Sequence, residues 1–449
     1  MPYAISKLGL VHGFVWMLIC TLIVMFSLHC LSITACSLSG RQTSYFSAAT
    51  KYAPRLRLSV DLSIIIQGWG VCLSYLILVG NSIPSLYLFV YSLFYEAYDD
   101  MLFFGFEPRQ FSIVATMLFV LFPLCCLKTL RALKFMSILA IMCVVYILLM
   151  ILAYFALFLL YSDESIFQLF RLNVVDRLPI SLWKWSFEGI LRSIPIFIFG
   201  FTCHHNLFNI FNELKQPRSI GKLNKISVVS IASVGMIYFL IAAAGYVTLG
   251  DGVDSKLFDS YEYGDVENHL ISEFSIILDQ FDPLRVSLFM GRLCLLLIVI
   301  SAFPIQFYPI KISIHNLWTY FMHDADAPSE SRLLAPLSDL DMSSPVLSPL
   351  IGDQHPKRGM RSDRFHYCVT SIYCLICLIL ALFVTEFGAV LSLVGATGDN
   401  YIALFFGPYI YLLISKGNPP TSRSYWKEAC SYFLICFSIL LGMMVLAIL

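Results

Sequence analysis

The chain has 449 residues, of which 59% are hydrophobic and 13% are charged, and its formal net charge at neutral pH is zero. A soluble domain is closer to half apolar and a quarter charged, and one of this size could not bury so much apolar surface in water. The composition therefore argues against a soluble protein, the charge gives no support to nucleic-acid binding, and the spread of apolar runs predicts one membrane domain over residues 1–449.

Ten apolar runs are predicted to be membrane-spanning helices, because crossing the hydrocarbon core takes about 20 residues. Only helices and closed barrels satisfy the backbone in lipid, and these runs are too long for barrel strands, so the predicted class is an all-α multi-pass membrane protein. In chain order the runs are residues 10–36, 58–90, 111–127, 135–160, 190–210, 226–249, 286–310, 365–385, 401–414 and 429–449. The run 401–414 is short, and the Gly-rich stretch before it, 387–398, is a candidate re-entrant segment.

The loops between these runs alternate in charge. The first loop is basic, the loop 251–282 is acidic, and Glu386 and Asp399 are assigned to an outer loop because neither has a basic neighbour. Lys and Arg favour the cytoplasmic side, so basic loops are predicted inside and acidic loops outside, with both termini outside. Residues 315–363, rich in Ser, Pro and Asp, are predicted to form a flexible cytoplasmic loop.

The run 190–210 contains the most unusual chemistry. Pro195 removes a backbone donor, Gly200 and Thr202 fall near the expected midplane, and a polar stripe follows, formed by His204, His205, Asn206, Asn209 and Asn212. Polar residues inside a membrane are costly, and an interrupted helix frees backbone groups that can hold a ligand. We interpret this cluster as a functional site. The alternative is that Pro195 only kinks the helix and the histidines pack at the interface.

Other intramembrane features have simpler interpretations. The glycines in Gln67-Gly68-Trp69-Gly70 predict close helix packing. Arg292 is predicted to extend its head toward the interface, and His12 is predicted to pack rather than to act chemically. The sequence has no Walker, Rossmann or HExxH pattern, so no catalytic residue, metal site or cofactor is predicted and the chain is not expected to be an enzyme.

Pro195 to Leu214 resembles the sixth-helix signature of the amino acid/auxin permease family, with Gly200 where the family usually has Ala. Further similarity lies in Gly70–Gly80, in Phe122-Pro123-Leu124 followed by Lys128, and in Leu391–Gly398 followed by Pro408. The family belongs to the amino acid–polyamine–organocation superfamily. The resemblance covers essentially the whole chain and implies a LeuT-like fold, with two inverted five-helix repeats and an extra C-terminal helix.

The resemblance also implies a site and a function. The substrate would be an amino acid bound between broken first and sixth helices, at Phe199, Gly200, Phe201, Thr202 and Tyr3. Candidates for ion coupling or gating are His204, Asn206, Glu213 and Ser301, with H⁺ or Na⁺ as the coupling ion and facilitative transport left open. His204 could relay protons or could hold helix geometry. The membrane would be the plasma membrane or that of the vacuole or lysosome, and the oligomeric state is not indicated.

The first helix departs from the family pattern. It usually has an unwound Gly-x-Gly segment before Leu-Pro-Tyr-Ala-Phe, whereas this chain begins Met1-Pro2-Tyr3-Ala4-Ile5. Most of the first helix is therefore predicted to be missing, and we hypothesise an amino-terminal truncation. The competing function is a non-transporting amino acid sensor or scaffold that signals through residues 315–363. A membrane acyltransferase using His204 is a more distant alternative.

Overall fold

The computed structural model describes residues 1–38, 43–92, 107–127, 134–160, 180–215, 217–254, 257–262, 283–323, 360–417, 419 and 423–448. Every regular element in these ranges is helical. The long helices are α2 (Leu10–Ser37), α4 (Arg57–Ser92), α7 (Lys134–Leu160), α9 (Phe187–Phe201), α11 (Ile220–Leu249), α14 (Pro283–His323), α16 (Met360–Phe383) and α19 (Tyr425–Ile448).

Shorter elements connect or extend these helices. They are α1 (Pro2–Leu8), α3 (Tyr45–Tyr52), η1 (Pro54–Leu56), α5 (Pro108–Thr116), η2 (Met117–Leu121), α6 (Phe122–Cys125), η5 (His204–Asn206), α10 (Leu207–Glu213), η6 (Gly250–Gly252), α12 (Leu257–Glu262), α17 (Phe387–Val394), η9 (Gly395–Asp399), η10 (Tyr401–Phe406) and α18 (Gly407–Gly417). Three of them, η2, η9 and η10, are π-helical.

The predicted all-α, multi-pass class is confirmed. Within the described ranges, 10 helices are long and apolar enough to cross a membrane. The prediction of a re-entrant segment at 387–398 is wrong. Residues 387–417 form a single span in which α17, η9, η10 and α18 follow one another without interruption. The π-helical turns accommodate the Gly-rich stretch without breaking the helix. The assignment of Asp399 to an outer loop is therefore also wrong, since it lies inside this span and is 1% exposed.

Both ends of the predicted loop 315–363 are helical, which corrects the prediction there. Helix α14 continues to His323 and α16 starts at Met360, while residues 324–359 lie outside the described part of the chain. Ring packing explains the longer helices, since His315 and Trp318 of α14 lie 5.6 and 5.7 Å from the ring of Phe365 on α16. Because residues 315–363 are rich in Ser, Pro and Asp, the apolar residues among 315–323 were not recognised as the end of a helix.

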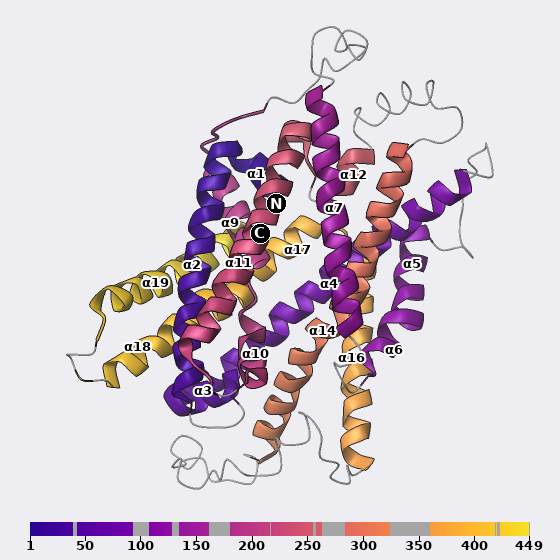
Figure 1. Cartoon of the computed structure of the whole chain (residues 1–449). Coiled ribbons are helices and arrows are strands. Elements are labelled where there is room, and N and C mark those ends of the chain that lie inside the picture. Colours follow the sequence, from indigo (N-terminus) through magenta and orange to yellow (C-terminus); the bar gives the residue numbers. More distant parts are fainter. Residues whose placement is uncertain are drawn as a thin grey trace.

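Figure 1 shows how the helices are arranged. Helices α2, α7, α11, α14 and α16 run between the two ends of the bundle, and α4 and α17 cross it obliquely. Helices α3 and α10 lie at the lower end, whereas α1 and α12 lie at the upper end. The basic segment around α3 and the acidic turn η6, which contacts α1, therefore lie at opposite ends, which agrees with the predicted alternation of loop charge.

Close packing brings α4 against the α17–α18 span. A Cβ atom added at Gly70 would lie 1.9 Å from Val394, and one added at Gly398 would lie 2.7 Å from the backbone nitrogen of Gln67. The predicted packing role of the Gln67–Gly70 run is therefore confirmed. The prediction that Arg292 extends toward the interface is wrong. The side chain is 4% exposed, and its guanidinium donates to the Phe258 carbonyl at 3.4 Å. Helix α12 covers this side chain and supplies an acceptor inside the protein.

Candidate functional site

The expected break in the 190–210 span is present. Helix α9 ends at Phe201, Thr202 is extended with φ −74° and ψ 108°, and α10 resumes after the turn η5. The Thr202 hydroxyl donates to the Ile198 carbonyl at 2.7 Å, and its amide bonds only to Phe199, at 3.2 Å. A hydroxyl that competes for a carbonyl of the last turn favours helix termination. The break thus lies one to two residues after Gly200.

The break leaves polar backbone groups in the middle of a span. Among the backbone hydrogen bonds of the described residues, the next donor after Thr202 is Asn206, which bonds to the Cys203 carbonyl at 3.1 Å. The amides of the residues between them are not in the helical ladder. Buried backbone groups need partners, so these donors can serve a bound ligand.

Two tyrosines hold the ends of the break. The Tyr238 hydroxyl on α11 donates to the Gly200 carbonyl at 3.0 Å, and the Tyr45 hydroxyl on α3 donates to the His204 carbonyl at 2.6 Å. Burial raises the pKa of Tyr45 well above its ordinary value, so its hydroxyl stays a neutral donor. Sequence reasoning missed both residues, because both come from segments far from the break in the chain and neither has a local motif.

The two histidines lie within the protein. His204 is 0% exposed and His205 is 6% exposed, and their ring nitrogens have no hydrogen-bond partner among the described residues. The backbone at His204 is held through its carbonyl by Tyr45, and not through its ring. His205 lies beside Gln306 of α14, which also lies beside Tyr75 of α4. Helices α4 and α14 thus add polar side chains to the break.

Helix α1 packs along α9. The Ser193 hydroxyl donates to the Ala4 carbonyl at 3.0 Å, and a Cβ atom added at Gly200 would lie 2.2 Å from the Met1 methyl carbon. The pairing of these two segments agrees with the implied site. The Tyr3 ring lies 4.9 Å from the Lys7 ammonium. Met1, which precedes α1, is the residue that lies against Gly200.

The remaining candidates are not brought to one place. Asn206 lies at the start of α10, and Glu213 is exposed at its end. Ser301 on α14 is buried, and its hydroxyl donates to the Leu297 carbonyl of its own helix at 2.6 Å. Gln306 of α14, which sequence reasoning did not single out, lies beside His205.

A strap formed by residues 180–186 crosses the junction of α1 and α2. The amides of Leu10 and Val11 donate to the Ser181 and Leu182 carbonyls, both at 2.9 Å, and the Lys184 amide donates to the Leu8 carbonyl at 2.8 Å. Gly9 has φ +86°, and a Cβ atom there would lie 2.8 Å from the Ser181 oxygen. Glycine is therefore required at this junction by both its conformation and its space.

His12 of α2 contacts this strap. Its Nδ1 lies 2.9 Å from the Lys184 carbonyl, and the Trp16 indole donates to its Nε2 at 2.9 Å. Since a carbonyl only accepts and an indole only donates, the ring is the neutral tautomer with its proton on Nδ1. The His12 ring also stacks on Trp183, with centroids 4.4 Å apart. The predicted packing role of His12 is confirmed.

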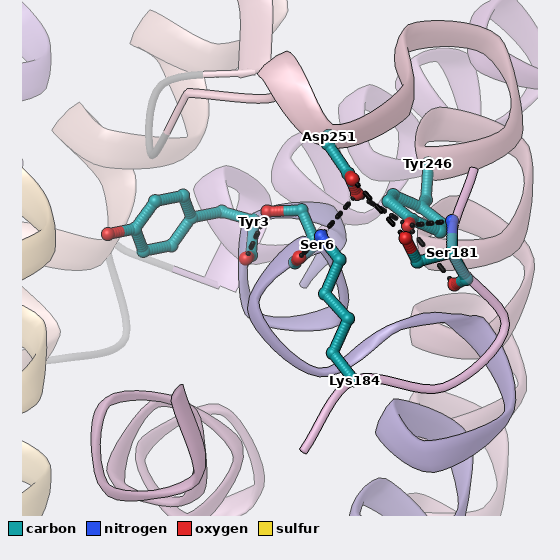
Figure 2. Close-up of polar contacts among 6 residues, drawn as sticks. All are labelled: Tyr3, Ser6, Ser181, Lys184, Tyr246 and Asp251. Atoms are coloured by element: carbon teal, nitrogen blue, oxygen red, sulfur yellow. Dashed lines mark hydrogen bonds and ion pairs between the residues drawn. The ribbon is translucent and has the colours of Figure 1, made fainter. Parts of the chain in front are cut away.

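Figure 2 shows how the strap joins α1 to the end of α11. The Lys184 ammonium donates to the Ser6 carbonyl at 2.8 Å and pairs with an Asp251 oxygen at 2.6 Å. The same oxygen accepts the Tyr246 hydroxyl at 2.7 Å, and the other oxygen lies 3.5 Å from the Ser181 hydroxyl. The Tyr3 ring points away from this network. One lysine thus fixes α1 against both the strap and η6.

Replacing Lys184 with Met is expected to destabilise the protein. The substitution removes the charge partner of Asp251 and the donor to the Ser6 carbonyl, while the Tyr246 and Ser181 bonds to Asp251 remain. Leaving a partly buried carboxylate with weaker compensation costs about 1–3 kcal/mol. We expect a lower melting temperature of the detergent-solubilised protein. The control is Lys222→Met, at an exposed lysine. Equal melting temperatures of the two variants would contradict a stabilising role for Lys184.

Comparison with known proteins shows which family this chain resembles. The profile of the family described as transmembrane amino acid transporter protein matches residues 1–449. The chain is 28% identical over 427 residues to vacuolar amino acid transporter 6 of Saccharomyces cerevisiae, covering 92% of this chain and 86% of the relative. It is 27% identical over 427 residues to vacuolar amino acid transporter 5 of that yeast, covering 93% and 85%. The resemblance inferred from the sixth-helix signature is confirmed.

Proposed function

Because this chain belongs to the family of transmembrane amino acid transporter proteins, we propose that it moves amino acids across a membrane by alternating access, with the break between α9 and α10 as the substrate site. The family makes the chain a multi-pass membrane transporter and not an enzyme. The observation that carries the proposal is the interruption at Thr202 and Cys203 within a span.

The chemistry of the break suits a zwitterion. An amino acid needs acceptors for its ammonium group and donors for its carboxylate. Carbonyls at the end of α9 are acceptors, and the amides after Thr202 that lie outside the helical ladder are donors. In the low dielectric of the membrane interior, each of these interactions is stronger than in water. In our proposal Phe199, Gly200, Phe201 and Thr202 contribute the acceptors, and the residues directly after Thr202 contribute the donors.

Side chains from three other helices surround the break and set its size. Tyr238 of α11 fixes the Gly200 carbonyl, Gln306 of α14 lies near His205, and Tyr75 of α4 lies near Gln306. Met1, which precedes α1, lies against Gly200. We propose that movement of α1 and α9 relative to α4 and α14 opens the site alternately to each side, as in transporters built on discontinuous helices.

The membrane and the driving ion are also part of the proposal. The curated relatives are named as vacuolar transporters, which supports a vacuolar or lysosomal membrane for this chain. We propose ion-coupled transport, with H⁺ or Na⁺ as the coupling ion.

Counterflow into proteoliposomes tests this function. Vesicles that contain the full chain and are loaded with the twenty standard unlabelled amino acids are diluted into each ³H-labelled amino acid in turn. We expect saturable, stereoselective accumulation of a subset, absent from protein-free vesicles. Absence of counterflow for every amino acid would contradict transport. Binding without flux, detected as a ligand-dependent rise in melting temperature, would instead favour the sensor or scaffold.

Gradients imposed on the same vesicles identify the ion. Uptake is measured with an inward proton gradient and, separately, with an inward sodium gradient, each with and without an ionophore that dissipates it. Accumulation that follows one gradient assigns the coupling ion. Uptake that only equilibrates would show facilitative transport.

A further inference from the structure

Asp399 is a buried carboxyl group without a hydrogen-bond partner. It is 1% exposed, it lies in the π-helical segment η9 within the span 387–417, and neither carboxylate oxygen has a partner among the described residues. An isolated ionised carboxylate is strongly disfavoured in such surroundings, and such a group neutralises instead. In this conformation Asp399 is therefore the protonated acid.

The helices packed on η9 offer no counter-ion to Asp399. They are α4, α9, α17, η10 and α19. Their charged residues with known contacts are engaged elsewhere: Arg57 of α4 with the Pro54 carbonyl, Asp61 of α4 with Asn316, Glu188 with Arg192 on α9, Lys427 of α19 with His29, and Glu428 of α19 with Ser415.

The other titratable groups on these helices are tyrosines and cysteines, which supply no positive charge in either protonation state. They comprise Cys72, Tyr75, Tyr87 and Tyr91 on α4, Tyr401 on η10, which pairs with Ser59, and Tyr425, Cys430, Tyr432 and Cys436 on α19. Helix α17 has none, and His204 and His205 lie on η5, which packs against η10. None of the charged side chains described on these helices therefore pairs with Asp399, and a proton bound to its own carboxyl group neutralises it.

The position of η9 links Asp399 to the substrate site. A Cβ atom added at Gly395 would lie 2.2 Å from the Pro195 carbonyl oxygen of α9, and one added at Gly398 would lie 2.7 Å from the Gln67 backbone nitrogen of α4. The π-helical segment is therefore packed directly between the broken helix and its opposing helix. Movement of α9 relative to α4 must shift η9, and π-helical turns are frequent at functional sites.

From this geometry we propose that Asp399 is the proton-binding site that couples amino acid transport to a proton gradient. The inference rests on the proposed transport function and names its coupling residue. Asp399 takes up one proton from the acidic side, its neutral form permits the closed packing of η9 seen here, and it releases that proton once α9 moves and water reaches the carboxyl group. The only chemical change is the gain and loss of one proton by the carboxylate.

The test separates coupling from translocation by using Asp399→Asn. The amide has nearly the same shape as the neutral acid but cannot ionise, so the transport cycle remains while proton transfer is lost. In proteoliposomes we expect counterflow of the ³H-labelled mixture of the twenty amino acids, at equal pH on both sides, to persist. Accumulation driven by an inward proton gradient is expected to fall to the level of vesicles treated with a protonophore. Wild-type accumulation by D399N would overturn the proposal.

Two further measurements keep the outcomes distinct. The matched variant is Asp61→Asn, at a second buried aspartate that already accepts a hydrogen bond from Asn316 at 3.4 Å, and it is expected to keep proton-driven accumulation. If wild-type protein shows no counterflow, the proposed function fails rather than this inference. If wild-type accumulation follows sodium and not protons, the assignment of Asp399 as a proton site is wrong.

If D399N does not fold, as judged by size-exclusion chromatography, Asp399→Glu decides the question. It keeps an ionisable carboxyl group in altered packing, so we expect proton-driven accumulation to persist with a shifted pH at half-maximal rate. A pH dependence identical to that of the wild type would overturn the proposal.

Discussion

Replacing Thr202 with Trp is expected to reduce amino acid counterflow to the level of protein-free vesicles. Thr202 is the extended residue that ends α9, and it is only partly buried, so its side chain lies at the proposed substrate site. An indole there would fill the space that the substrate ammonium or carboxylate must reach and would displace the polar backbone of the break. The measurement is counterflow by purified protein whose melting temperature is determined in parallel.

The control for this substitution is Thr21→Trp. Thr21 of α2 is also partly buried, and its hydroxyl donates to the Met17 carbonyl at 2.7 Å, the same local bond that Thr202 makes to Ile198. The two variants therefore impose the same local change at different places in the fold. Unchanged counterflow in T202W, or an equal loss in T21W, would remove the break from the proposed site.

Replacing Gly395 with Ala is expected to lower both stability and transport. The added methyl group would lie 2.2 Å from the Pro195 carbonyl oxygen and 2.8 Å from the carbonyl carbon. Because both contacts are to backbone, no side chain can rotate away, and α9 and η9 must separate. Overpacking of this kind costs about 1–3 kcal/mol. We expect a lower melting temperature in detergent, and slower counterflow because α9 contains the substrate site.

The same change at Gly221 gives the matched comparison. Gly221 is helical, and a Cβ atom there meets nothing within 4 Å. Ala favours a helix over Gly by up to about 1 kcal/mol, so G221A should melt at or above the wild-type temperature and transport normally. If G395A melts like the wild type, the contact between η9 and α9 is not as close as its geometry indicates.

The break at Thr202 was predictable because its causes are local. The features that cause it, which are Pro195, Gly200 and the polar stripe, all lie within residues 195–212. Each of them weakens a helix or is costly in lipid, whatever surrounds it. Tyr238 and Tyr45 were not predictable in the same way. Each contacts the break through one hydroxyl from a segment far along the chain, and hydropathy contains no information on which helices become neighbours.

Asp399 shows how a local pattern can mislead. The Gly-rich stretch 387–398 predicts a re-entrant segment, and Asp399, which has no basic neighbour, is predicted to lie in an outer loop. In the fold, the glycines instead allow close approach of α9 and α4, and the segment stays helical. The same packing buries the carboxyl group and turns a charge that looked peripheral into a candidate coupling site.

By itself the sequence determined that the chain resides in a membrane, that about ten helices cross it, and that one of them is interrupted, since these follow from the free energy of placing each residue in lipid. Only the tertiary structure decided that Lys184 fixes α1 to Asp251, that Gln306 lies beside His205, and that Asp399 is buried without a partner among the described residues. Those outcomes depend on which distant segments pack together, and packing is a property of the whole chain.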